Sequence, residues 1–328
     1  MPICFILGNI GNCFNLIVFG QRSSRSNSCL LYFLSASVIN IVIINFGLVL
    51  RIVRGLWNID PSANSLWFCR WRLYLTSTSF LIYRYSIVLA CIDRMCASSR
   101  HAWMRSVSRT QVAYRLIAIK WILCFAYFTP SLVFPVIRFG QCVIPPGTTY
   151  ATYLPIVTLI QAFLIPSTMS ICGLITFTHL KSMQSRVVPT NTDANDTRKK
   201  VSQYIIMLFV QVACDWLGNL SYPCYLIFSL IFPAPLTPLM TAIASFWINM
   251  STTIPFINYS AAFYLHTLSS PAFRLKLLRF IGQIMWFQRL IRLNNEPQNT
   301  QTMGMITMRG RTANAVDHQR IQQYDETV

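Results

Sequence analysis

A thiol and an ion pair bracket the stretch of this chain whose residue types could support both binding and signalling. Cys69 opens the mostly apolar sequence CRWRLYLTSTSFLIYRYSIVLACIDR, and the pair Asp93-Arg94 closes it. As one helix the stretch would be roughly 37 Å long at ~1.5 Å per residue, which exceeds a bilayer core of ~30 Å. It therefore predicts a membrane-spanning helix with a thiol at one face and an ion pair at the other.

A second charged pair lies inside apolar sequence. Arg84 precedes Arg94 by ten residues, and Asp215 follows Gln203, where another apolar stretch begins, by twelve. These spacings place both charges at similar depths, roughly 15 Å and 18 Å. A lone charge at the bilayer centre costs ~2.5–3.5 kcal/mol on insertion scales, so we predict that Arg84 pairs with Asp215. The alternative is that Arg84 meets asparagine and backbone oxygens, while Asp215 is protonated or hydrated.

The remaining polar chemistry does not indicate an enzyme. No nucleophile–base spacing and no metal-ligating cluster stands out, so we expect no catalytic activity, no metal and no cofactor. The four histidines are scattered: they are His101, His179, His266 and His318.

Composition identifies a membrane protein. The 328 residues are 54% hydrophobic and only 11% charged, whereas soluble domains carry about 25% charged residues. The net charge of +18 is explained by the excess of basic residues in cytoplasmic loops. Nucleic-acid binding is not expected, because basic residues that lie between lipid-length apolar stretches cannot bind phosphates.

Seven stretches are long and apolar enough to predict an all-α bundle of seven transmembrane helices. We expect residues 1–280 to form the bundle, with Pro271–Phe280 as a short helix in the inner interface, and 281–328 to be a disordered cytoplasmic tail. The first stretch begins at residue 2, so we expect the natural amino terminus to lie upstream. The stretches are Pro2–Phe19, Leu30–Leu50, Cys69–Cys96, Leu116–Ile137, Thr152–Phe177, Ser202–Phe232 and Leu239–Leu268.

Basic residues set the expected orientation. The odd-numbered connections and the tail carry most of them, including Arg22, Arg100 and Lys181, so we predict an outer amino terminus and a cytoplasmic carboxyl terminus. In that topology Cys69 and Cys142 both face an oxidising compartment, and a disulfide is expected. The alternative is two unpaired thiols.

The order and spacing of several motifs resemble the rhodopsin-like (class A) G-protein-coupled receptors. This resemblance implies a plasma-membrane receptor whose Asp93-Arg94 pair couples to a heterotrimeric G protein, with arrestin and receptor kinases as further partners. The matching motifs are Gly11-Asn12 with Asn15, Asp93-Arg94-Met95, Trp121 with Pro130, Pro166, Pro223, and Phe263-Tyr264-Leu265-His266 followed by Phe273-Arg274.

The departures from that family bear on activity. Asn40 stands where the family has a sodium-binding aspartate, and Leu220-Ser221-Tyr222-Pro223 lacks the tryptophan of the sixth span. The seventh-span Asn-Pro-x-x-Tyr motif is not kept at residues 262–266. A decayed, non-signalling receptor is therefore an alternative, and so is a transporter or channel lined by the intramembrane polar residues. The absence of internal repeats argues against a transporter.

Residues expected near the outer ends of the spans constrain the ligand. Thr76 replaces the aspartate that amine receptors of this family carry, and the seventh span has no lysine for retinal. Outer arginines beside tryptophans suit anionic or peptide ligands, although each could instead reach lipid headgroups. The chain thus resembles invertebrate neuropeptide receptors. We expect the pocket to be lined by Arg72, Thr76, Tyr222 and Trp247.

Overall fold

The computed structural model describes residues 1–57, 59–138, 140–184, 192–232, 237–271 and 273–282, with only the backbone described for 180, 182–184 and 192–204. The chain divides into two units, Met1–Leu277 and Leu278–Val328. Of the second unit only residues 278–282 are described, and they are helical. The expected cytoplasmic tail, 281–328, lies almost wholly outside the described residues.

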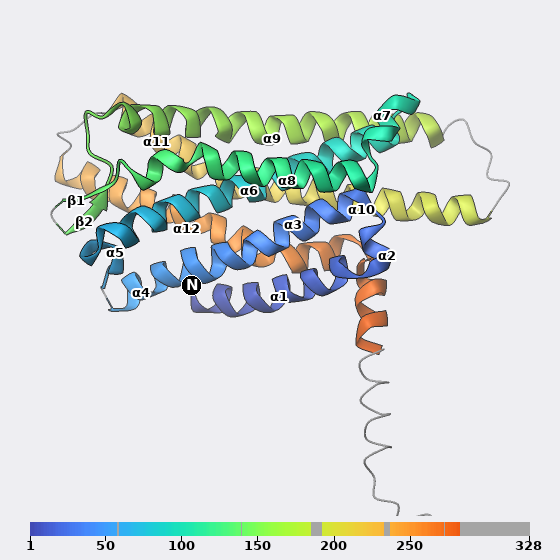
Figure 1. Ribbon diagram of the computed structural model, residues 1–328, viewed down its shortest axis with the longest axis horizontal. Helices are drawn as coiled ribbons and strands as arrows, with labels where there is room; N and C mark the ends of the chain where they lie inside the picture. The colour runs from blue at the N-terminus through green and yellow to red at the C-terminus, as the bar shows by residue number, and fades with distance from the viewer. Residues whose placement is uncertain (58, 139, 185–191, 233–236, 272, 283–328) are drawn as a thin grey trace, which may run out of the picture. The chain divides into compact units, whose positions relative to one another are not determined.

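The first unit is built from long helices joined by short connections (Figure 1). Short elements complete it, and among the described residues the only strands form a hairpin. The long helices are α1 (Pro2–Gly20), α3 (Ser28–Val42) continuing through the π-helical η1 (Ile43–Leu48) into α4 (Val49–Trp57), α6 (Leu66–Ser98), α8 (Thr110–Tyr127), α9 (Thr149–Gln184), α10 (Thr192–Asn219), α11 (Ser221–Ile231) and α12 (Pro238–Ser269). The short elements are α2 (Arg22–Arg25), α5 (Pro61–Asn64), α7 (Ala102–Val107), the 3₁₀ helix η2 (Thr129–Leu132), and strands β1 (Val136–Arg138) and β2 (Gln141–Val143).

Five helical segments of the described chain are long and apolar enough to cross a membrane, which confirms a helical membrane protein. The 18-residue α8 contains Arg115 and Lys120, and α12 is 32 residues long but interrupted by polar residues; neither is among the five. The five segments are Pro2–Gly20, Ser28–Trp57, Leu66–Ser98, Thr149–His179 and Ile205–Ile231.

Two prolines explain where the helices depart from the expected stretches. The fourth stretch was expected to continue to Ile137, but α8 ends at Tyr127 and Pro130 opens the 3₁₀ turn η2. The sixth is interrupted between α10 and α11 at Leu220. Pro223 has no N–H to bond the carbonyl of Asn219, so one backbone hydrogen bond of the helix is missing at this break.

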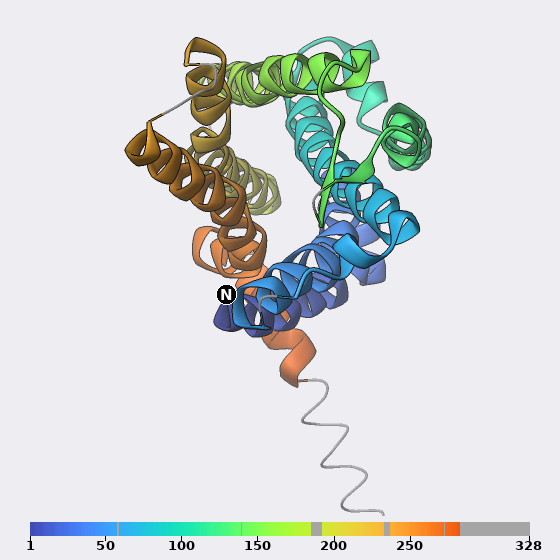
Figure 2. The ribbon, with the colours of Figure 1, turned by 90° about the vertical axis from the view of Figure 1, so that its left-hand side faces the viewer.

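The packing places α6 among several partners. It packs against α3, α8 and α9, while α12 packs against α1 and α10, and the first unit's helices surround a central region when viewed end-on (Figure 2). The hairpin, α5 and α11 lie at one end of this bundle, here called the hairpin end (Figure 1). The opposite end carries α2 and α7 and is here called the α7 end (Figure 1).

Residues 271 and 273–277 are helical and follow α12, where the short interfacial helix was expected. Phe273 is 1% exposed, and its ring lies 5.3 Å from that of Phe19 and 5.9 Å from that of Phe263. This aromatic contact anchors the segment to α1 and α12.

Candidate functional site

A disulfide joins the hairpin to the first turns of α6, as expected. Cys69 and Cys142 are bonded, with their Cα atoms 5.6 Å apart and a sequence separation of 73. In the hairpin Cys142 pairs with Ile137, and the chain reverses at Gly140, whose φ of 68° suits glycine. Arg70 adds a second tie, since its Nε donates to the carbonyl oxygen of Pro135 at 3.1 Å.

A cavity of about 800 Å³ lies between α4, α6, α9 and α12. Such a volume is within the ~300–1,000 Å³ typical of small-molecule sites. Thr76, Tyr222 and Arg72, which the sequence suggests for a ligand pocket, line this cavity. Trp247 is not among its lining residues; its ring packs 5.6 Å from that of Phe228 and 6.3 Å from that of Tyr225. Trp247 therefore does not line this cavity, and its role in ligand binding stays a prediction.

The charges that line this cavity are all basic in the described chain: they belong to Arg51, Arg54, Arg72 and Arg84. Arg51 donates to Thr253 Oγ1 at 3.3 Å, and its guanidinium carbon lies 5.5 Å from the centre of the Phe256 ring. Arg70 does not line the cavity; it bonds to Pro135, the residue just before β1.

Asp60 balances part of this charge at the hairpin end. Its carboxylate lies 3.6 Å from Arg54 and caps α5 by accepting from the Ser62 amide at 3.0 Å. Burial raises the pKa of this carboxyl, but the bonds from Ser62 and the charges of Arg72 and Arg54 outweigh that effect and leave the pKa below its ordinary value of 3.8. Asp60 is therefore ionised at neutral pH.

At the floor of the cavity Arg84 belongs to a network that crosses three helices. Its Nη2 donates to Asn219 Oδ1 at 2.6 Å, and the Asn219 amide donates to Asp215 Oδ1 at 3.1 Å. Asn258 of α12 donates to the same oxygen at 3.3 Å. The structure thus brings Arg84 and Asp215 together, but through Asn219; no direct ion pair between them is found within the described residues.

Asn40 belongs to a second buried hydrogen-bond network. Its amide donates to Asn12 Oδ1 at 3.3 Å, and Asn12 donates to the backbone oxygens of Gly8 at 2.8 Å and Tyr259 at 3.3 Å. This chain of amides joins α3, α1 and α12 without a charge.

The Asp93-Arg94 pair is buried near the α7 end. Asp93 is 4% and Arg94 7% exposed, and Arg94 Nε donates to the adjacent Asp93 carboxylate at 3.1 Å. Arg94 Nη2 also donates to Asn27 Oδ1 at 3.2 Å, and Ser108 donates to Asp93 Oδ1 at 2.7 Å. The pair is thus held by the turn before α3 and the connection after α7.

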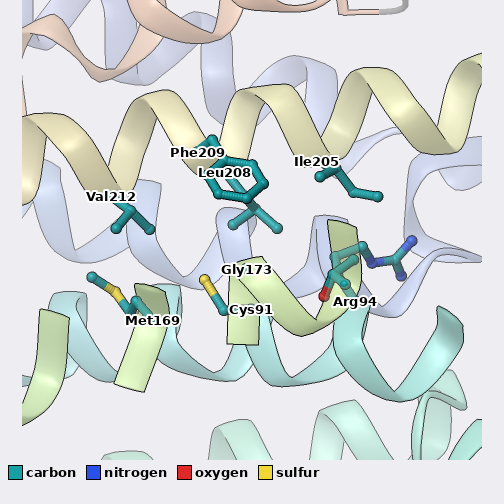
Figure 3. Close-up of a pocket in the computed structure, with 9 residues that line it drawn as sticks. Cys91, Arg94, Met169, Gly173, Ile205, Leu208, Phe209 and Val212 are labelled. Atoms are coloured by element: carbon teal, nitrogen blue, oxygen red, sulfur yellow. The ribbon is translucent and has the colours of Figure 1, made fainter. Parts of the chain in front are cut away.

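The space between α6, α9 and α10 beside Arg94 is closed. Leu208 and Phe209 of α10 lie over Gly173 of α9, with Val212 on the side of Met169 and Ile205 on the side of Arg94 (Figure 3). The remaining cavity is about 10 Å³, barely the volume that one water needs. Gly173 allows this closeness, because a Cβ there would lie 3.2 Å from two ring atoms of Phe209. Within the described residues, the space beside Arg94 is too small to admit a segment of another protein.

Sequence reasoning missed one buried charge. Lys120 of α8 is 7% exposed and donates to Ser35 Oγ at 3.0 Å and Ser86 Oγ at 2.5 Å. Trp121 Nε1 donates to the same Ser35 at 3.0 Å. The signal for this site was a lysine five residues inside an apolar stretch, with serines at matching depths in two others.

Comparison with known proteins finds one distant relative to report. Over 176 residues, 51% of this chain, the sequence is 24% identical to the muscarinic acetylcholine receptor M4 of Xenopus laevis. The aligned part covers 34% of that receptor, so the chain spans about a third of the length of the curated relative it matches. No protein-family model matches the chain. The chain is thus a helical membrane protein with distant similarity to a muscarinic receptor over half its length.

Proposed function

We propose that this chain is a seven-helix plasma-membrane receptor that binds an extracellular ligand and activates a heterotrimeric G protein. In this proposal α8 and α12 cross the bilayer beside the five apolar segments, and the amino terminus is extracellular. The observation that carries the proposal is the layout of α6. Its disulfide and the cavity lie toward the hairpin end, and its buried Asp93-Arg94 pair lies near the α7 end.

The proposed mechanism is a shift between two states. The closed crevice beside Arg94 is the resting state, and ligand binding favours a state in which the Arg94 end of α10 swings away from α6 and α9. The opened crevice would admit the G protein, and Arg94 would then exchange its partners for those of the G protein. Arrestin and receptor kinases would act on the same inner face.

The network around Asn219 is proposed to stabilise the resting state. Arg84 lies on α6 and Asp215 and Asn219 on α10, so a displacement of α10 would strain or break the 2.6 Å bond from Arg84 to Asn219. A ligand in the cavity can bias this bond directly, because Arg84 and Asn219 both line its floor.

The ligand class proposed here is a peptide rather than an amine. The curated relative is by name an acetylcholine receptor, but the cavity of this chain is lined by arginines, and Thr76 replaces the family's amine-binding aspartate. Guanidinium groups bind carboxylates and peptide oxygens well and would repel a quaternary ammonium.

The test is a peptide-library screen on cells that express the chain and report calcium and cyclic nucleotide. A responding peptide should accelerate nucleotide exchange on a purified heterotrimer, and Arg94→Ala should abolish exchange while leaving peptide binding intact. A peptide-gated current without exchange would instead establish a channel. Peptide binding with neither response would establish a non-signalling receptor.

A further inference from the structure

The mouth of the cavity carries an excess of positive charge. Arg51, Arg54 and Arg72 lie close enough to repel one another, and Asp60 is the only acidic group that the described structure places beside them. The fourth arginine differs: Arg84 is linked through Asn219 to Asp215. The uncompensated charge therefore belongs to the mouth rather than to the floor.

Two of the mouth arginines have hydrogen-bonding capacity to spare. The Nε of Arg72 is buried and has no acceptor within the described part of the chain. Arg51 bonds to a neutral acceptor, the hydroxyl of Thr253. Guanidinium groups prefer charged, planar acceptors and can bind a carboxylate through two parallel bonds.

Below the arginines the wall carries large apolar side chains beside the hydroxyls of Thr76 and Ser77. Phe80, Leu81, Phe128 and Phe256 line this part of the cavity. Arg72 and Arg84 are separated by twelve residues of α6, or about 18 Å along the helix axis. The cavity thus runs from a cationic mouth, along a wall with large apolar side chains, to a polar floor at which Arg84 is linked to Asp215.

We propose that the ligand of this cavity is an amphiphilic carboxylate, whose acid group is bound by Arg51 and Arg72 and whose apolar body extends toward Arg84. The proposal rests on the receptor function proposed above and deepens it. The acid group could be the free carboxyl terminus of a peptide or that of a small organic acid, since both present the same chemistry to the arginines.

The test measures binding without any G protein. The full chain is purified in detergent, and its melting temperature is followed against 4-phenylbutyrate, its amide, acetyl-Phe-Leu with a free carboxyl terminus, and the amidated form of that peptide. Phenethylamine and sodium chloride at equal ionic strength are the controls. At least one acid should stabilise the protein saturably and bind about tenfold or more tightly than its amide, because bonds to charged groups are the strong ones.

Matched variants identify the arginines that bind. Arg51→Gln and Arg72→Gln should each weaken acid binding at least fivefold without changing the amide. Arg70→Gln removes the same charge from the same helix as Arg72 but lies outside the cavity, so it should leave acid binding unchanged. Because Arg51 and Arg72 lie on different helices, one variant can decide if the other does not fold.

The outcomes separate the two sources and the two proposals. Stabilisation by the peptide acid alone indicates a peptide carboxyl terminus, and stabilisation by phenylbutyrate alone indicates a small organic acid. If no acid exceeds its amide, if the amine binds best, or if both variants bind acids normally, the proposal is overturned. A receptor that binds acids but never activates a G protein would refute the signalling function and leave this inference standing.

Discussion

Replacing Asn219 with leucine should raise ligand-independent signalling. Leucine has a similar size but offers neither the oxygen that accepts from Arg84 at 2.6 Å nor the amide that donates to Asp215 at 3.1 Å. Both bonds involve a charged group, and each such bond contributes about 1.5–3 kcal/mol. If one such bond is made only in the resting state, its loss shifts the equilibrium toward the open state by about 13–160-fold.

The assay is nucleotide exchange on a purified heterotrimer by the full chain in nanodiscs, without added peptide. From a minor state populated at about 0.1–10%, a shift of this size gives an exchange rate well above that of the unmodified chain. Asn45→Leu is the matched control, since Asn45 is exposed and bonds only to Asn9 and its own helix in the described structure. Its basal exchange should not change.

A second arm tests whether charge itself matters in this network. Asp215→Ala should also raise basal exchange, and exchanging the two charges, Arg84→Asp with Asp215→Arg, should lower it again. Asn219 now accepts from Arg84 with its side-chain oxygen and donates to Asp215 with its amide. In the exchanged protein, a flip of this side-chain amide group would let it donate to the carboxylate at position 84 and accept from the guanidinium at position 215. Normal basal exchange in a folded Asn219→Leu protein, or no recovery in the swapped protein, would refute this account of the resting state.

Two further predictions concern the outer end. Cys142→Ser should lower the melting temperature, because it removes a disulfide that closes a long loop and contributes about 2–4 kcal/mol; thermal melts under non-reducing conditions measure this, and an unchanged melt would contradict it. Asp60→Asn keeps an acceptor for the α5 cap but removes the charge 3.6 Å from Arg54, so the acids of the binding assay should bind several-fold more tightly. Acidification cannot replace this variant, because the assay acids would be protonated, and would lose the charge that the arginines bind, before Asp60 is. The depressed pKa of Asp60 means that its stabilising bonds are present above its ordinary pKa of 3.8 and are lost as pH falls through the lower folded value.

The parts of the fold that follow from local pattern could be predicted from the sequence. The apolar stretch of α6 was enough to predict that helix. Helices α1, α9 and α12 begin and end within a few residues of the expected stretches, except that α9 extends further at its carboxyl-terminal end. The disulfide followed from two cysteines expected on one side of the membrane. These features depend on residues close together in sequence or on the side of the bilayer that a loop occupies.

What could not be predicted depends on helix rotation and on how helices meet. The depths of Arg84 and Asp215 were estimated from helical rise, but rise does not reveal that Asn219, one turn after Asp215, reaches Arg84 first. Trp247 was assigned to the pocket from its height alone, which does not reveal that its ring packs against Tyr225 and Phe228. The partners of Lys120 come from two other helices, so no pattern within α8 reveals them.

The central claim is that the arginine-lined mouth and the Arg94 end open on opposite sides of the plasma membrane. Cysteines introduced at Asn64, in α5 just before the disulfide end of α6, and at His101, just beyond its other end, test this directly; both positions are exposed. The measurement is labelling of intact cells by a membrane-impermeant maleimide, before and after permeabilisation. The account predicts that Asn64→Cys is labelled at once and His101→Cys only after permeabilisation. Labelling of both in intact cells, or the reverse order, would contradict it.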